Sequence, residues 1–106
     1  MGKIDPKIME TLKRFKAVAK GKYSIKRMIL FGSHASGKVR QNSDIDIMVV
    51  TGKRDSEIVA KLIDEWHMKQ GIEYPVDFVD YTSTEFNMLA KRISLVRHVL
   101  ENGIEI

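Results

Sequence analysis

The sequence predicts an α+β fold, in which a small mixed β-sheet carries helices mainly on one of its faces. The first reason is length, because 106 residues can bury one hydrophobic core and are too few for two. The second is the order of the patterns along the chain, which is helix, strand, strand, helix, strand, helix. The third is the absence of repeats and of linkers rich in proline or glycine, so we expect residues 1–106 to form a single domain.

Composition limits the kinds of site that this domain can hold. Without cysteine there are no disulfides, thiolate ligands or thiol nucleophiles, so a metal ion would need oxygen or imidazole ligands. No apolar run approaches the roughly 20 residues of a membrane span, and the first residues lack a signal-peptide pattern, so we expect a cytoplasmic protein. The net charge of +4 either steers a polyphosphate or nucleic acid toward a site or reflects a solvated, lysine-rich surface.

The N-terminal pattern predicts a helix over residues 6–19. Asp5 is a favourable N-cap, and Pro6 suits the first helical position. Apolar residues then recur at helical spacing, namely Ile8, Met9, Leu12, Phe15 and Val18. We expect Gly21 to end this helix.

Two short apolar runs predict buried strands, and a further helix follows them. Residues 27–31 end at Gly32, while residues 45–50 are rich in β-branched side chains and end at Thr51-Gly52. Between residues 56 and 69 the apolar side chains lie on one helical face, and Gly71 follows as a C-cap. This helix returns the chain to the sheet.

The last third of the chain predicts one more strand and one more helix. Residues 76–79 follow a proline and form the third strand. The spacing from Thr82 to Glu85 is that of a capping box, and we expect the helix that begins there to continue to about residue 102 and to end at Gly103. We expect Trp66 and Phe86 to be core residues.

A glycine and a hydroxyl directly follow the first strand, where the chain must turn sharply. Free backbone N–H groups at Gly32-Ser33, together with the Ser33 hydroxyl, suit the binding of a phosphate, especially if a short helix begins there. Taken alone, the same pattern is also that of an ordinary structural turn. We expect the next residue, His34, to occupy an exposed part of this turn rather than to touch phosphate.

Asp44 and Asp46 stand two residues apart at the start of the second strand. Because residues i and i+2 share one face of a strand, the two carboxylates project together. Such a pair is unfavourable unless a cation joins it, and magnesium fits because it takes carboxylate ligands and completes its shell with water and phosphates. The alternative is that the pair caps a strand end or meets lysines.

The third strand supplies a further acid, either Asp77 or Asp80. Strand alternation places Asp80 in phase with the apolar Val76 and Phe78, which leaves Asp77 on the face of Val79. We therefore expect Asp77 to complete the site, as a ligand of a second metal ion or as the general base for an attacking hydroxyl. We expect Asp80 to be a strand-end cap or a surface acid.

These motifs together resemble the polymerase-β-like nucleotidyltransferase superfamily. The resemblance rests on Gly32-Ser33, ten intervening residues, Asp44-Ile45-Asp46 and the later Val76-Asp77-Phe78-Val79. In size and order the chain is similar to the minimal nucleotidyltransferase (MntA-like) family. The resemblance implies a nucleotidyltransferase-like fold in which Asp44, Asp46 and Asp77 bind Mg²⁺ or Mn²⁺, while Gly32 and Ser33 hold the triphosphate of ATP.

The resemblance also implies an activity and a partner. Proteins of this family are often encoded beside a HEPN-domain toxin, so this chain would be the antitoxin that transfers AMP from ATP to a tyrosine of that toxin. Further nucleotide contacts are expected from Ser43, Lys38 and Arg40. Family members commonly carry arginine where this chain has Ser36, and Lys38 or Arg40 either replaces that cation or is a solvated loop charge.

Two other functions are compatible with the sequence. A non-catalytic module would neutralise its partner by covering it and would use the acidic site only to bind nucleotide. The three acids argue against this reading, whereas Ser36 argues for it. A nucleic-acid-binding domain rests on the basic balance alone and lacks an aromatic stacking surface, so we expect no direct binding of nucleic acid.

Overall fold

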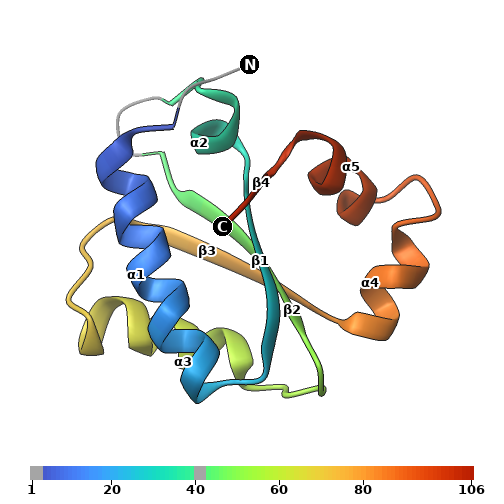
Figure 1. Cartoon of the computed structure of the whole chain (residues 1–106), viewed down its shortest axis with the longest axis horizontal. Helices are drawn as coiled ribbons and strands as arrows, with labels where there is room; N and C mark the ends of the chain where they lie inside the picture. The colour runs from blue at the N-terminus through green and yellow to red at the C-terminus, as the bar shows by residue number, and fades with distance from the viewer. Residues whose placement is uncertain (1–3, 40–42) are drawn as a thin grey trace.

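The structure, a computed structural model, describes residues 4–39 and 43–106 and has the predicted α+β fold (Figure 1). Its elements are, in order, α1 (Pro6–Lys22), β1 (Ile25–Phe31), α2 (Ser33–Ser36), β2 (Ile45–Thr51), α3 (Ile58–Ile63), η1 (Asp64–Lys69), β3 (Val76–Thr82), α4 (Ser83–Leu89), α5 (Leu95–Asn102) and β4 (Ile104–Glu105). The η1 segment continues α3 as a π-helix. Within the described ranges, no helix is long and apolar enough to cross a membrane.

The sheet brings three strand ends to one edge. Its strand order is β3-β2-β1-β4, in which β2 and β3 are parallel while β1 is antiparallel to β2 and to β4. The end of β1 therefore lies beside the starts of β2 and β3. In the register, Asp46 pairs with Phe31 on one side and with Asp77 on the other. The predicted turn and the predicted acids consequently meet at this edge.

The larger core lies on the face of the sheet that α1, α3 and η1 cover. Its centre is a group of three rings, with centroids 5.0 Å apart for Phe15 and Trp66 and 5.7 Å apart for Phe15 and Phe78. Trp66 is completely buried, and its Nε1–H donates to the carbonyl of Tyr74 at 2.9 Å. This core holds β3 in place, so it also positions the start of that strand.

A smaller core lies on the opposite face, under α4 and α5. It contains Ile29, Met48, Val50, Phe86, Val96 and Val99. Arg27 links this layer to the edge strand β4, because its guanidinium lies 4.9 Å from the Phe86 ring centroid and also binds the carboxylate of Glu105. Figure 1 shows α4 and α5 on one side of the strands and α1 and α3 on the other, so helices cover both faces of the sheet, whereas the sequence predicted them mainly on one. The core positions predicted for Trp66 and Phe86 are confirmed.

The prediction that Gly21 ends the first helix was wrong. The helix continues to Lys22, and the chain becomes extended only at Tyr23. Glycine costs a helix about 0.5–1 kcal/mol relative to alanine, which a tertiary contact can offset. Here Lys22 Nζ donates to Glu65 at 2.9 Å, and the Glu65 side chain is 1% exposed. The ion pair between Lys22 and Glu65 therefore offsets the helical cost of Gly21.

The prediction of one continuous helix after Thr82 was also wrong. The capping box is present, since Thr82 and Glu85 each bind the other's backbone, but α4 ends at Leu89 and α5 begins at Leu95. Ser94 causes the break: its hydroxyl donates to the carbonyl of Leu89 at 2.6 Å and accepts from the backbone of Arg97. After Gly103 the chain adds β4, a short strand that the sequence did not predict.

Candidate active site

Two of the three predicted acids are neighbours on adjacent strands. Asp46 is the second residue of β2, Asp77 is the second residue of β3, and the two pair directly in the parallel register. They share a face with Met48 and Val79, which belong to the smaller core farther along the same strands. Asp44 lies just before β2 and is exposed. The structure thus gathers these carboxylates where α4 and α5 no longer cover the sheet.

The electrostatics of Asp46 show how crowded this edge is with negative charge. Partial burial is the largest cause that raises the pKa of Asp46, and the charges of Asp77 and Asp44 raise it further. Only His34 acts in the opposite direction. The protein therefore holds Asp46 in surroundings that disfavour its own charge, which is what a cation-binding carboxylate experiences when no cation is present.

Gly32 follows β1 and lies against the carboxylate of Asp46. Its φ is +75°, a conformation that L side chains rarely adopt, and a Cβ built there would lie 2.3 Å from Asp46 Oδ2. A side chain at position 32 would therefore force the Asp46 carboxylate to move. A glycine is therefore required both by the backbone turn and by the close approach of Asp46.

Replacing Gly32 with alanine is expected to lower the free energy of unfolding and to displace the Asp46 side chain. The strained backbone alone costs about 1–3 kcal/mol, and the overlap with Asp46 adds to it. The measurement is the free energy of unfolding by urea, with Gly21→Ala as the matched control. Gly21 lies inside α1 with no atom within 4 Å of the position of a new Cβ, so that variant should be as stable as the wild type or more stable. Equal stability of Gly32→Ala and Gly21→Ala would contradict this assignment.

The predicted phosphate-binding turn does begin a short helix, α2. A helix leaves its first N–H groups without intrahelical partners, so those of Ser33 and His34 are available to an anion. The Ser33 hydroxyl makes no hydrogen bond to another residue in the described ranges, whereas its carbonyl accepts from Lys38 at 3.1 Å. The turn is thus held by its backbone, and the hydroxyl remains available.

The prediction that His34 is exposed was wrong. Its side chain is 8% exposed, and Nε2 lies 3.2 Å from the carbonyl oxygen of Ser43, a contact that requires the proton to be on Nε2. The imidazole therefore ties α2 to the residue that precedes Asp44. Nothing in the sequence indicated that His34 would be buried, because its contact with Ser43 joins residues nine positions apart.

The remaining predicted nucleotide contacts are less fully defined. Lys38 is exposed, and Ser36 uses its hydroxyl to donate to the carbonyl of Ser33 at 3.2 Å. Ser43 lies directly before Asp44, and its carbonyl contacts His34. Arg40 lies outside the described residues.

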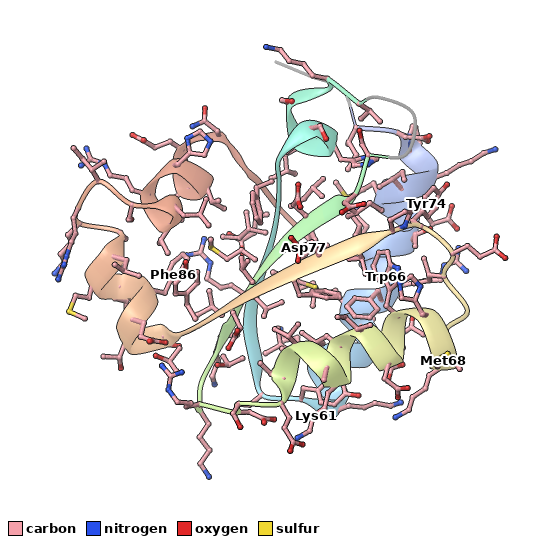
Figure 2. The ribbon with its side chains drawn as sticks, turned by 180° about the vertical axis from the view of Figure 1, so that it is seen from behind. Lys61, Trp66, Met68, Tyr74, Asp77 and Phe86 are labelled. Atoms are coloured by element: carbon pink, nitrogen blue, oxygen red, sulfur yellow. The ribbon has the colours of Figure 1, made fainter. Side chains whose placement is uncertain are left out.

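Asp80 does not lie at a strand end as predicted, because β3 continues two residues beyond it to Thr82. It pairs with Val49 in the register and is half-buried. In phase with Phe78, it faces the side of the sheet that α1 and α3 cover. Figure 2 shows Asp77 and Trp66 on opposite sides of β3, so the face of Asp80 is not that of the predicted site. Asp77 and Asp80 therefore lie on opposite faces of the sheet, as expected from strand alternation.

The donor set at this edge fits a hard divalent cation. Asp44, Asp46 and Asp77 offer only oxygen ligands, and the raised pKa of Asp46 shows that the first and third add repulsion which a cation would relieve. In the part of the chain that the structure describes, neither these three carboxylates nor any other three acidic or histidine side chains converge into a group that could hold a metal ion. A cation held here would therefore take its other ligands from water and substrate phosphates, as Mg²⁺ usually does.

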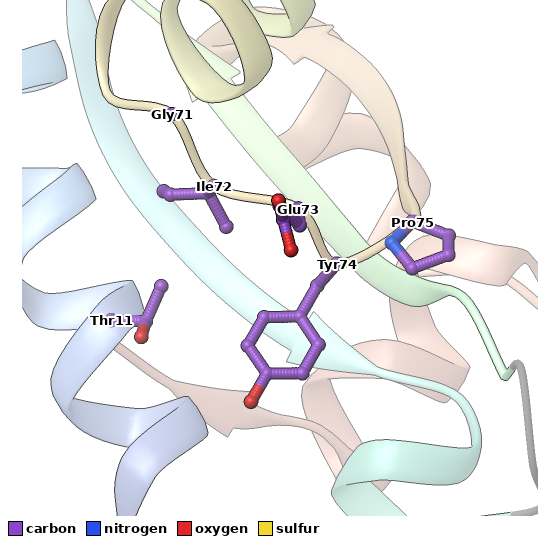
Figure 3. Close-up of a pocket in the computed structure, with 6 residues that line it drawn as sticks. All are labelled: Thr11, Gly71, Ile72, Glu73, Tyr74 and Pro75. Atoms are coloured by element: carbon purple, nitrogen blue, oxygen red, sulfur yellow. The ribbon is translucent and has the colours of Figure 1, made fainter.

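A hollow elsewhere on the surface does not carry this chemistry. It lies between α1 and the loop before β3, and Figure 3 shows Ile72 and Tyr74 projecting into it toward Thr11. Glu73 is the one acidic residue among its lining side chains, and Asp44, Asp46 and Asp77 do not line it. We therefore place the candidate active site at the carboxylate edge.

At this edge of the sheet, carboxylates that suit an oxygen-ligated cation lie beside a turn whose backbone N–H groups suit a phosphate. Comparison with known proteins makes this specific, because the family model "Polymerase beta, Nucleotidyltransferase" matches residues 13–105. The chain belongs to this nucleotidyltransferase family, as its motifs predicted.

Relatives agree with the family assignment, and solved structures share the fold. Over 98 residues the chain is 37% identical to "Putative protein adenylyltransferase MJ0604" of Methanocaldococcus jannaschii, covering 89% of this chain and 92% of the relative. A 42-residue match at 50% identity to "Putative protein adenylyltransferase MJ1379" of the same organism spans 40% of this chain and 42% of that relative. Among structures, "a putative nucleotidyltransferase from Sulfolobus solfataricus" superposes with a TM-score of 0.58 at 17% identity, covering 93% of this chain and 78% of the other. A mutant of the toxin-antitoxin MntA-HpeT gives a TM-score of 0.59 at 21% identity, with coverage of 90% and 70%.

Proposed function

We propose that this nucleotidyltransferase is the antitoxin of a HEPN/MNT pair and transfers AMP from ATP to a tyrosine hydroxyl of its partner toxin. The observation that carries the proposal is the pairing of Asp46 with Asp77 beside the Gly32 turn. This arrangement combines carboxylates for a cation with backbone donors for a triphosphate. The relatives named for protein adenylylation support the choice of a protein acceptor.

Each residue of the site has a role in this proposal. The N–H groups at the start of α2 and the Ser33 hydroxyl bind the triphosphate and orient its α-phosphorus toward the acceptor. Mg²⁺ or Mn²⁺ at Asp44 and Asp46 would supply the positive charge that neutralises the phosphate oxygens. Lys38 contributes a further cation in the loop.

Asp77 is the general base that removes the proton of the acceptor hydroxyl. As the tyrosine oxygen forms its bond to the α-phosphorus, the bond from that phosphorus to the bridging oxygen of the leaving group breaks and pyrophosphate departs. Asp77 accepts the hydroxyl proton, for which an exposed carboxylate on the same face as Asp46 is suitably placed. The reaction consumes one ATP and yields an adenylylated tyrosine and pyrophosphate.

Two observations support a folded protein as the acceptor. A small-molecule acceptor usually needs a pocket that buries most of its surface, whereas the carboxylate edge is open. A folded partner that brings its own tyrosine would complete such an edge. The likeness to a chain of the toxin-antitoxin MntA-HpeT supports a toxin in this role.

The test is to incubate the protein with labelled ATP, Mg²⁺ and the product of the neighbouring gene, and to locate modified residues by mass spectrometry. We expect adenylylated tyrosine on the partner, with no label when Mg²⁺ is removed by a chelator or when Asp44→Asn replaces the wild type. Neutralisation of the partner that persists in Asp44→Asn without any adenylyl group would instead establish the non-catalytic module.

A further inference from the structure

The turn between α4 and α5 exposes apolar side chains that the fold itself does not use. Ile93 is 97% exposed, Met88 is 51% exposed, and Leu95 is 42% exposed. These residues flank the break in the helix that the sequence did not predict. In Figure 1 the segment that joins α4 to α5 forms the outer edge of the molecule. Full exposure of an isoleucine at such a corner gives nothing to the stability of the domain.

The turn is held in a defined shape despite its exposure. The backbone N–H of Arg92 donates to the carbonyl of Leu89 at 3.2 Å, and the Ser94 hydroxyl donates to the same carbonyl at 2.6 Å. Leu89 and Ala90 pack against the smaller core directly before the turn. Ile93 is thus presented by an ordered segment, which lowers the entropy that a partner would have to remove on binding.

The charges around Ile93 specify the kind of partner. Residues 88–98 contain the cations Lys91, Arg92 and Arg97 and no acidic residue. In the described structure none of the three cations has an acidic partner within ion-pair distance. An apolar residue rimmed by unpaired cations complements an apolar pocket rimmed by carboxylates. This argues for an acidic protein surface.

We infer that the α4–α5 turn is the docking surface for the protein acceptor, whose acidic, apolar-centred surface receives Ile93. The inference rests on the proposed function, because the acceptor is the toxin proposed above. The helices that bear the turn cover the same face of the sheet as Asp46 and Asp77. A partner held there lies on the side of the molecule from which the carboxylates are reached.

The test measures the affinity of the full chain for the product of the neighbouring gene by isothermal titration calorimetry. Ile93→Asp should raise Kd at least tenfold, equivalent to about 1.4 kcal/mol. Met68→Asp is the matched control, because Met68 is 77% exposed on η1, and Figure 2 shows it far from Phe86 of α4. Its Kd should stay within about twofold of the wild type.

A second pair of variants tests the charges. Lys91→Glu should slow association several-fold at low salt, whereas Lys13→Glu, an identical charge change on exposed α1, should have a smaller effect. Unaltered binding by Ile93→Asp, or equal effects of the two lysine variants, would overturn the inference while leaving the proposed function in place. Loss of a wild-type dimer in Ile93→Asp with unchanged toxin affinity would assign the surface to self-association and overturn it too. Failure of the wild-type protein to bind the neighbouring product would refute the proposed partner, and this inference with it.

Discussion

Asparagine in place of Asp46 is expected to abolish adenylyl transfer while leaving the fold intact. Asp46 lies between Gly32 and Asp77 and is the most enclosed of the three carboxylates. Its loss removes a ligand and a charge that no neighbour can replace. Transfer should fall below detection in a single-turnover assay, and Asp44→Asn should have the same outcome.

The same substitution is expected to stabilise the cation-free protein at neutral pH. Because the pKa of Asp46 is raised in the folded state, its ionised form costs stability once the pH exceeds its unfolded pKa, near 3.9. The folded state then binds more protons than the unfolded state, so stability falls as the pH rises through this window. Asp46→Asn removes the effect, and its gain in melting temperature at pH 7 should vanish below about pH 4.

The matched control is Asp64→Asn, an exposed aspartate on η1. That variant should retain wild-type transfer and should lack the pH-dependent gain in stability. If Asp46→Asn unfolds, or keeps most of its transferase activity, the assignment of Asp46 to the metal site is wrong.

Asparagine in place of Asp77 is expected to slow the chemical step more than it weakens the binding of triphosphate. A general base contributes about 10²–10⁴-fold to a rate, and the loss would exceed that range if Asp77 also binds a metal ion. The measurements are the single-turnover rate at saturating ATP and the Kd for ATP from titration.

Asp80→Asn is an internal control for Asp77 because both residues belong to β3. Strand alternation directs them to opposite faces of the sheet, so Asp80→Asn should transfer AMP at about the wild-type rate. Equal kinetics of the two variants would show that the third acidic role does not belong to Asp77.

Local rules accounted for the parts of the site that depend on few neighbouring residues. The phase of Asp77 against Asp80 depends only on strand geometry, and β3 has it as expected. Asp44 lies just before β2, so it is outside the strand that the i, i+2 argument assumed. The turn at Gly32 was recognised from its sequence, but the close approach of the Asp46 carboxylate, fourteen residues away, is visible only in the structure.

The features that were missed depend on contacts outside the pattern of a single helix or turn. His34 is buried because the chain returns at Ser43, and α1 passes Gly21 because Glu65 holds Lys22 from another helix. The break between α4 and α5 depends on Ser94, a residue whose hydroxyl competes with helix only when it bonds the preceding turn. At His34 and Gly21 a propensity worth less than about 1 kcal/mol per residue was outweighed by a contact with another segment, whereas at Ser94 it was outweighed by a local hydrogen bond.

The sequence by itself determined the fold class, the acidic motif and the family of this protein. The fold class and the acidic motif follow from periodicity and spacing, which the backbone geometry of strands and helices converts directly into shared faces. The family follows from the resemblance of the combined motifs to known nucleotidyltransferases and from the family model that matches residues 13–105. Only the tertiary structure decided that Asp46 and Asp77 pair in the register, that α4 and α5 cover their face, and that Ile93 projects from the corner. Register and exposure are properties of strands and helices packed together, so they are set by the free energy of the whole core and by no single segment of the chain.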